Sequence, residues 1–315
     1  MERTASTGRT VKRAEKHGFC SGVRIADLKV KRFAAAGGRG AVLGQLVHNE
    51  RVVEEMENLG GGTVDEIAAL AEQMEEQMQE STIVFSAHGV PPSFHERARA
   101  AGLTILDTTC KFVYDLHRES QDALAAGYHL VFIGDPKHRE VIGYTNDLDP
   151  ATYHVVSTVE EAAGIGWSHY AKIKVFYQTT LNAEELEDVV QTIECRAAHV
   201  ERADTICYAT KQNQDAARLL AHDPDVDLIV VIGGTKSANT KHLWEICRES
   251  KPSYLVQGAA DLDPEWFRNA KVVGVTAGAS TPDYVIDEVE ARIEELTAAP
   301  AGGRRNEILA MEERC

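Results

Sequence analysis

Short apolar runs alternate with longer, partly polar segments along most of the 315 residues. The runs are rich in β-branched residues, which is typical of strands buried on both faces, whereas the segments between them have the composition of helices. The clearest predicted strands are residues 41–47, 82–85, 103–106, 129–133, 153–156, 172–176, 227–232, 253–256 and 272–275. Strands and helices in alternation predict an α/β protein with mostly parallel sheets.

Polar side chains suited to binding a ligand follow many of these predicted strands. In a parallel sheet, the carboxyl ends of the strands and the helix N-termini that follow them face one edge, where ligands bind. The side chains found at these ends are His48, Asn49, His88, His138, Thr179, Thr180, Ser237, Asn239 and Ser280.

The strand ends recur in a fixed order with three cysteines, Cys20, Cys110 and Cys207. Each cysteine is followed by two strand ends that carry ligand-type residues. This internal repeat predicts three similar α/β domains around one shared centre. The predicted limits are residues 21–109, 110–203 and 204–297, with residues 10–20 joining the third domain and residues 298–315 forming a mobile tail.

Cys110 follows Asp107-Thr-Thr109, a cluster suited to capping a helix. A thiol at a helix N-terminus is expected to have a lowered pKa, because free N–H groups and the helix dipole favour the thiolate. Cys20 and Cys207 lie at similar polar junctions. Cys195 and Cys247 fall late in helical patterns, where buried structural thiols are expected.

The three junction thiols leave more than one interpretation open. They could be separate core residues, or they could converge to bind zinc or an iron–sulfur cluster. Structural zinc usually takes a fourth ligand and local pairs of ligands, and no C-x-x-C pair is present. A cluster bound by only three cysteines would leave one iron free for a substrate.

The imidazoles of His48, His88 and His138 would form an anion pocket together with helix N-terminal N–H groups. Such donors suit a small diphosphate better than a nucleotide. The segment Gly233-Gly-Thr-Lys-Ser237 lacks the first glycine of a Walker motif, which argues against an ATP site.

Glu140 lies two residues beyond His138, at a predicted helix start. An ordinary acidic residue of a first helical turn is one interpretation. In a pocket, the same carboxyl is a candidate proton donor, supported by the hydroxyls of Thr179 and Thr180.

Charge and composition narrow the setting. A net charge of −16 argues against nucleic acid as a partner, because neutralising phosphates requires a basic surface. The first thirteen residues contain no apolar signal segment, and no run approaches transmembrane length. We therefore expect a cytoplasmic protein with no membrane partner and reduced thiols.

Nine motifs, in this order, resemble the 4-hydroxy-3-methylbut-2-enyl diphosphate reductase family of the non-mevalonate isoprenoid pathway. They are His17-Gly-Phe-Cys-Ser-Gly-Val23, Val47-His-Asn49, Phe85-Ser-Ala-His-Gly-Val90, Asp107-Thr-Thr-Cys110, His138-Arg-Glu-Val141, Gln178-Thr-Thr-Leu181, Ile206-Cys-Tyr-Ala-Thr210, Ser237-Ala-Asn239 and Thr276-Ala-Gly-Ala-Ser280. The resemblance covers roughly residues 11–296 and implies three α/β domains in pseudo-threefold arrangement around a central iron–sulfur site.

The resemblance also implies a role for each matching residue. Cys20, Cys110 and Cys207 would ligate one 4Fe–4S cluster. Glu140 would be the proton source, and Thr179 would position the substrate hydroxyl. The diphosphate would be bound by His48, His88, His138, Thr180, Ser237, Asn239 and Ser280.

The implied reaction removes the hydroxyl of (E)-4-hydroxy-3-methylbut-2-enyl diphosphate, giving isopentenyl and dimethylallyl diphosphate. Two electrons would come from a ferredoxin or flavodoxin-type donor. Three departures from the family pattern concern Ala238, residues 134–138 and residues 211–214. Two rival hypotheses are a non-catalytic diphosphate or cluster sensor and a zinc hydrolase.

Overall fold

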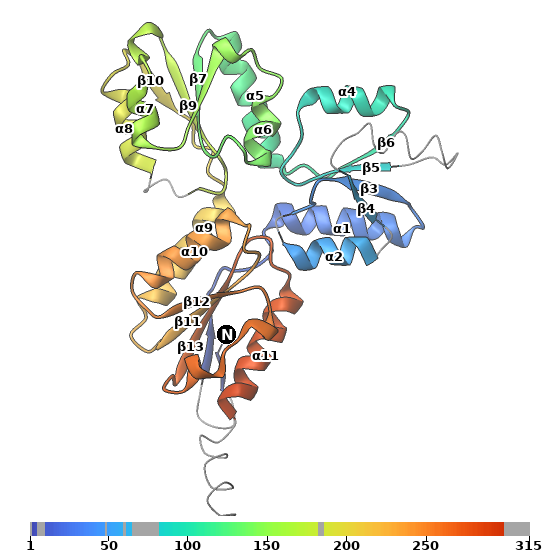
Figure 1. Ribbon diagram of the computed structural model, residues 1–315, viewed down its shortest axis with the longest axis vertical. Helices are drawn as coiled ribbons and strands as arrows, with labels where there is room; N and C mark the ends of the chain where they lie inside the picture. Colours follow the sequence, from blue (N-terminus) through green and yellow to red (C-terminus); the bar gives the residue numbers. More distant parts are fainter. Residues whose placement is uncertain are drawn as a thin grey trace, which may run out of the picture.

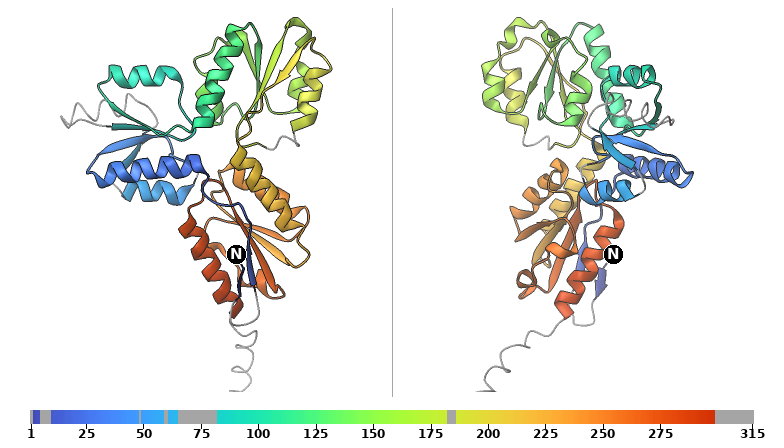
Figure 2. Two further views of the ribbon diagram at one scale, coloured as in Figure 1. Left: turned by 180° about the vertical axis from the view of Figure 1, so that it is seen from behind. Right: turned by 45° about the vertical axis from the view of Figure 1, so that its right-hand side comes forward.

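Three lobes surround a common centre in the computed structural model (Figures 1 and 2). The structure describes residues 2–4, 10–47, 49–58, 61–64, 82–181 and 186–298. Each lobe is built on its own sheet, and all strand pairs except β1 with β2 are parallel. The predicted α/β class with mostly parallel sheets is confirmed.

The first lobe has the strand order β4-β3-β5-β6. Its strands are β3 (Gly40–Leu43), β4 (Gly61–Val64), β5 (Thr82–Phe85) and β6 (Thr104–Asp107). Its helices are α1 (Ser21–Ala35), α2 (Glu50–Asn58) and α4 (Pro92–Ala100).

The second lobe has the strand order β10-β9-β7-β8. Its strands are β7 (His129–Ile133), β8 (Tyr153–Val156), β9 (Ile173–Tyr177) and β10 (Val200–Arg202). Its helices are α5 (Lys111–Ala125), α6 (Arg139–Thr145), α7 (Val159–Gly164) and α8 (Glu187–Glu194).

The third lobe has the strand order β1-β2-β13-β11-β12. Its strands are β1 (Glu2–Thr4), β2 (Thr10–Arg13), β11 (Leu228–Ile232), β12 (Ser253–Val256) and β13 (Val272–Ala277). Its helices are α9 (Tyr208–Ala221), α10 (Ala238–Arg248) and α11 (Asp283–Ala298).

The three sheets share one strand order, in which the first strand of the lobe lies between the second and the third, and a fourth strand lies beyond the third. In the third lobe the N-terminal strand β2 takes the place of the fourth strand, with Val11 paired to Val273. Each fourth strand leads to a cysteine, and that cysteine precedes the first helix of the next lobe. The cysteines therefore lie where the chain crosses between lobes.

Burial on both faces explains the continuous apolar runs. In β11, Val230 and Ile232 belong to one apolar cluster, whereas Ile229 and Val231 belong to the cluster on the opposite face. All four are 0 % exposed. Burying such side chains contributes roughly 1.5–3 kcal/mol each, so the sheet rigidly supports the strand ends that follow it.

Three strands in the described residues were not predicted, β1, β4 and β10. β4 begins with Gly61-Gly62, which have no side chains to form an apolar pattern. Its strand geometry comes from pairing with β3. A helix predicted at residues 68–80 lies outside the described residues, as does the predicted tail beyond residue 298. No helix among the described residues has the length and apolar character needed to cross a membrane.

Candidate active site

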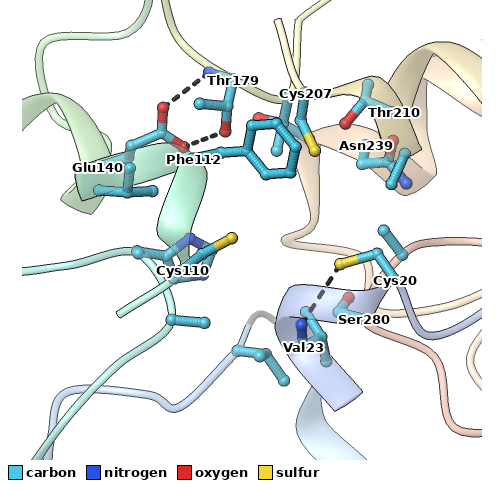
Figure 3. A pocket seen from close by; sticks show the side chains of 18 of the residues that line it. Cys20, Val23, Cys110, Phe112, Glu140, Thr179, Cys207, Thr210, Asn239 and Ser280 are labelled. Carbon is cyan, nitrogen blue, oxygen red and sulfur yellow. Dashed lines mark hydrogen bonds between the residues drawn. The ribbon is translucent and has the colours of Figure 1, made fainter. Parts of the chain in front are cut away.

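The three junction cysteines occupy the same position in their lobes. Cys20, Cys110 and Cys207 are the N-caps of α1, α5 and α9. The Cys20 sulfur accepts a hydrogen bond from the Val23 N–H at 3.4 Å. Figure 3 shows the three sulfurs directed into one cavity from three different elements. The structure thus brings together thiols that are far apart in the sequence.

Gly22 lets two of these thiols approach each other. A Cβ atom at Gly22 would lie 2.6 Å from the Cys110 sulfur and 3.9 Å from the Cys20 sulfur. The first distance is below van der Waals contact, so only glycine fits beside Cys110 without a shift. The first turn of α1 is therefore shaped around the thiol of a neighbouring segment.

The lowered thiol pKa expected from the sequence is wrong for two of the cysteines. Burial raises the pKa of Cys20 and of Cys110, and nearby thiols raise both further. Backbone N–H groups act in the opposite direction, including Val23 N–H on Cys20 and Phe112 N–H on Cys110. Desolvation is the larger effect because the cavity removes the thiols from water.

Glu140 is the second residue of α6. It is buried, with only 1 % of its surface exposed. Oε1 accepts a hydrogen bond from the Thr179 N–H, and Oε2 accepts one from the Thr179 hydroxyl, each at 2.7 Å. Burial raises the pKa of Glu140 to about 7, although the Thr179 donors act to lower it. Glu140 can therefore carry a proton near neutral pH, as a general acid requires.

His138 contacts both Glu140 and the imidazole of His88. It is the N-cap of α6, and its Nδ1 accepts a hydrogen bond from the Glu140 N–H at 3.2 Å. Its ring meets the His88 ring edge to face, with centroids 5.7 Å apart. Both imidazoles line the cavity that contains the thiols.

The third lobe contributes hydroxyl and amide groups. Ser237 is the N-cap of α10 and accepts a hydrogen bond from the Thr240 N–H at 3.3 Å. Asn239 is 3 % exposed, and neither of its side-chain amide atoms has a hydrogen-bond partner among the described residues. Ser280 follows β13 and is also buried. A buried amide without a partner is costly, so Asn239 is suited to a ligand with hydrogen-bonding oxygens.

Every residue to which the resemblance assigns a role lines one cavity, apart from His48, which lies outside the described residues. Asn49, also named at a strand end, is not among the cavity-lining residues, and its Oδ1 accepts a hydrogen bond from the Arg51 N–H. Phe112 and Thr210 also line the cavity and were not predicted (Figure 3). Both residues could have been found from the sequence, because each lies in the first turn of a helix whose N-cap is a cysteine. Side chains of that turn can reach the same cavity as the cysteine.

Of the remaining cysteines, the two that the structure describes, Cys195 and Cys247, do not line the cavity. Cys247 is fully buried between α10 and its sheet, as predicted. Cys195 is exposed, which corrects the prediction of a buried thiol. It is the C-cap of α8 and lies beyond the buried face formed by Val189, Val190 and Ile193. Cys315 lies outside the described residues.

These side chains define an α/β protein with a thiol-lined cavity at the junction of three mostly parallel sheets. Residues 11–294 match the family model of the LytB protein, and the chain belongs to that family. The family resemblance inferred from the sequence motifs is confirmed, and the chain is an oxidoreductase.

Relatives and solved structures agree on this family. The 4-hydroxy-3-methylbut-2-enyl diphosphate reductase of Aquifex aeolicus is 36% identical over 287 residues, covering 90% of this chain and 95% of the relative. The enzyme of the same name from Geotalea uraniireducens is 38% identical over 284 residues, covering 90% and 96%.

Two solved structures have the same fold. One is (E)-4-hydroxy-3-methyl-but-2-enyl diphosphate reductase, the terminal enzyme of the non-mevalonate pathway, with a TM-score of 0.67, 34% identity and coverage of 90% of this chain and 99% of the other. The other is the E-1-hydroxy-2-methyl-but-2-enyl-4-diphosphate reductase of Plasmodium falciparum, with a TM-score of 0.81, 26% identity and coverage of 96% and 98%.

Proposed function

We propose that the chain catalyses the reductive dehydroxylation of (E)-4-hydroxy-3-methylbut-2-enyl diphosphate. The observation that carries this proposal is a buried Glu140, whose pKa burial raises to about 7, in the same cavity as three convergent thiols. The two relatives, both 4-hydroxy-3-methylbut-2-enyl diphosphate reductases, support the same substrate. Two electrons and two protons are consumed, the allylic C–O bond breaks, and water leaves. One proton converts the departing hydroxyl to water, and the other is added to the allylic carbon chain.

The thiol set suits a 4Fe–4S cluster. Cys20, Cys110 and Cys207 offer soft sulfur ligands from three lobes, and the missing Cβ of Gly22 leaves room between two of them. Within the described ranges, no three His, Cys, Asp or Glu side chains are close enough to bind a single metal ion. When bound, such a cluster would supply electrons and an open iron site for the substrate hydroxyl.

The diphosphate would bind opposite the acid. Ser237 and Asn239 stand at the N-terminus of α10, where backbone N–H groups and the helix dipole attract an anion. His88 and His138 provide imidazole donors, and Thr180 and Ser280 complete the described lining. His48 is proposed from its motif. This grip would fix the substrate hydroxyl near the thiols and Glu140.

Glu140 would donate the proton that converts the leaving hydroxyl to water. Its two hydrogen bonds from Thr179 hold the carboxyl in one orientation. Thr179, in turn, would position the substrate hydroxyl. A proton donor is not required for ligand binding alone, so this pair favours an enzyme over a non-catalytic sensor.

The proposed electron donor is a ferredoxin or flavodoxin-type protein, and the proposed setting is the cytoplasm. The chain carries a net charge of −16, so docking of an acidic donor would need a locally basic surface. A direct check is the dependence of reduction rate on salt, which should be strong if charge guides docking.

Anaerobic purification tests the function and the cofactor together. We expect a brown protein with iron and sulfide that consumes the hydroxylated diphosphate when supplied with a chemically reduced viologen. Cys110→Ser should abolish both iron content and turnover, while Cys195→Ser, a change at an exposed thiol, should leave both unchanged. A colourless zinc protein that hydrolyses the substrate without electrons would overturn the proposal. So would an iron-containing protein that binds the substrate and never reduces it.

A further inference from the structure

A second cavity lies between α5 and the α4 segment of the first lobe, with a volume of about 310 Å³. It is separate from the thiol-lined cavity, and the two share no lining residue. Its lining includes two imidazoles, a phenol and a guanidinium. The lining residues are Val90, Pro92, His95, Thr109, Tyr114, His117, Arg118 and Gln121.

Tyr144 is a buried hydroxyl that the proposed reaction has not used. It lies four residues after Glu140 on α6, so the two side chains lie on the same side of the helix. The residue is 4 % exposed, and its ring stacks on Phe132 with centroids 4.7 Å apart. Its hydroxyl has no hydrogen-bond partner among the described residues. A buried hydroxyl without a hydrogen-bond partner is unfavourable, so a bound water or a functional partner is expected there.

His117 lies between Tyr144 and the second cavity. Its ring lines that cavity and meets the Tyr144 ring edge to face, with centroids 5.9 Å apart. Its Nε2 is buried and also has no hydrogen-bond partner within the described part of the chain. Burial lowers the pKa of His117 to about 4, with Asp147 acting to raise it and His95 to lower it. The imidazole is therefore neutral at pH 7, with one donor and one acceptor nitrogen.

Glu140 needs a new proton in every catalytic cycle. The carboxyl is 1 % exposed, and a bound diphosphate substrate would occupy the cavity on its open side. The Glu140 carboxylate must therefore receive its new proton by another route, or only after the product has left. His117 lines the second cavity and its ring contacts Tyr144, which lies on the same side of α6 as Glu140, and neither His117 Nε2 nor the Tyr144 hydroxyl has a hydrogen-bond partner among the described residues.

We propose that the second cavity, His117 and Tyr144 form a path that returns protons from solvent to Glu140. The proposal rests on the proposed function, because it assigns the source of the proton that Glu140 donates. A proton from water in the cavity is taken up at one imidazole nitrogen while the other nitrogen releases one. Because the Tyr144 hydroxyl has no direct hydrogen-bond partner among the described residues, one bridging water on each side would carry the proton, from His117 to the Tyr144 oxygen and from the Tyr144 hydroxyl to the Glu140 carboxylate, while the hydroxide left in the cavity exchanges with solvent. One proton moves from water to Glu140, and both relay residues return to their starting state.

Tyr144→Phe tests the path with little change in packing, because the ring and its stacking on Phe132 are kept. In rapid-mixing experiments at a pH below 7, where Glu140 starts protonated, the first turnover should proceed at the wild-type rate. Later turnovers should be at least about 10-fold slower, so that product forms in a burst. Substrate affinity should be unchanged. Tyr153→Phe, which also removes a hydroxyl next to Phe132, is the matched control and should show no burst.

His117→Ala tests the cavity side of the path. Turnover should fall by a similar factor, and added imidazole should restore it, because the cavity can admit the small molecule in place of the side chain. The same substitution at the exposed His199 should neither lower turnover nor respond to imidazole. Wild-type steady-state turnover in Tyr144→Phe, or loss in His117→Ala that imidazole does not restore, would overturn the proposal.

A measurement without turnover separates this proposal from the proposed function. The carboxylic acid band of Glu140, assigned in the infrared spectrum by its loss in Glu140→Gln, can be followed after a rapid drop in pH with saturating inorganic diphosphate, which would occupy the open side of the thiol-lined cavity as the substrate does. Its appearance should be at least about 10-fold slower in Tyr144→Phe than in wild type. If the wild-type protein reduces no substrate, the proposed function fails, and this rate still decides whether the path exists. Equal rates in the two proteins would exclude it.

Discussion

Thr179 donates both of its polar hydrogens to Glu140, from the backbone N–H to Oε1 and from the hydroxyl to Oε2, each at 2.7 Å. Thr179 follows β9, whereas Glu140 is in α6, which follows β7, so two adjacent strand ends of one sheet meet in this contact. The pair fixes both oxygens of the carboxyl inside the cavity (Figure 3). Several predictions about acid chemistry depend on this geometry.

Replacing Thr179 by valine should shift the pH dependence of turnover upward. The Thr179 hydroxyl lowers the pKa of Glu140, so its removal should raise that pKa further above about 7. Since the protonated carboxyl is the active form, turnover should fall at a higher pH than in wild type. Maximal turnover should drop about 10-fold because the carboxyl loses a fixed partner. Thr180→Val, at the neighbouring residue, is the control. In this variant turnover should fall at the same pH as in wild type.

Glu140→Gln should abolish proton donation while keeping the shape of the site. We expect turnover to fall at least about 100-fold, with substrate binding and iron content close to wild type. The readouts are the rate constant, the dissociation constant of the substrate and the iron-to-protein ratio. Turnover within a few fold of wild type would remove Glu140 from the proton path.

The same variant should change how stability depends on pH. Burial raises the pKa of Glu140 from 4.5 to about 7, so the folded protein retains a proton that the unfolded chain has lost in this range. The favourable contribution is complete below pH 4.5 and is lost as pH rises towards 7. Relative to Glu140→Gln, wild type should lose about 3 kcal/mol of unfolding free energy across this range. Urea unfolding of the iron-free wild type and Glu140→Gln at pH 4.5 and pH 7 measures this loss. If the unfolding free energies of the two proteins changed equally with pH, the buried state of Glu140 would be contradicted.

Gly22→Ala should disturb the thiol cluster. The new methyl group would lie 2.6 Å from the Cys110 sulfur, so α1 or Cys110 must shift. We expect reduced iron content and a corresponding loss of turnover, with far-ultraviolet circular dichroism unchanged. Gly164→Ala is the matched control because nothing lies within 4 Å of its added methyl group. Full iron content in Gly22→Ala would show that the thiols tolerate a different spacing.

Asn239→Asp should weaken diphosphate binding more than Asn239→Ala. Both variants remove a buried amide donor, which corresponds to about a 10- to 100-fold loss in affinity for a charged ligand. The aspartate adds like-charge repulsion, so its loss should be larger and should shrink at high salt. Calorimetric titration with inorganic diphosphate measures both. Asn269→Asp, at an exposed position far along the chain, controls for the added charge and should bind like wild type.

The sequence by itself determined the strands and the chemistry at their ends. Four predicted runs coincide with β5, β7, β8 and β12, because short buried strands have a continuous apolar pattern that needs no distant information. The ligand-type residues directly after the strands were also visible, since a parallel sheet aligns those ends at one edge. Roles for these residues came from the motif order and stay predictions.

Tertiary structure decided what the environment does to each side chain. The direction of the pKa change at Cys20 and Cys110 follows from burial by other lobes, which no local pattern contains. Strand β4 exists because β3 pairs with it. The contact of Thr179 with Glu140, and that of His117 with Tyr144, join residues on separate elements. Desolvation and contact depend on atoms distant in sequence, so a local pattern can supply the chemical groups but cannot set their protonation or their partners.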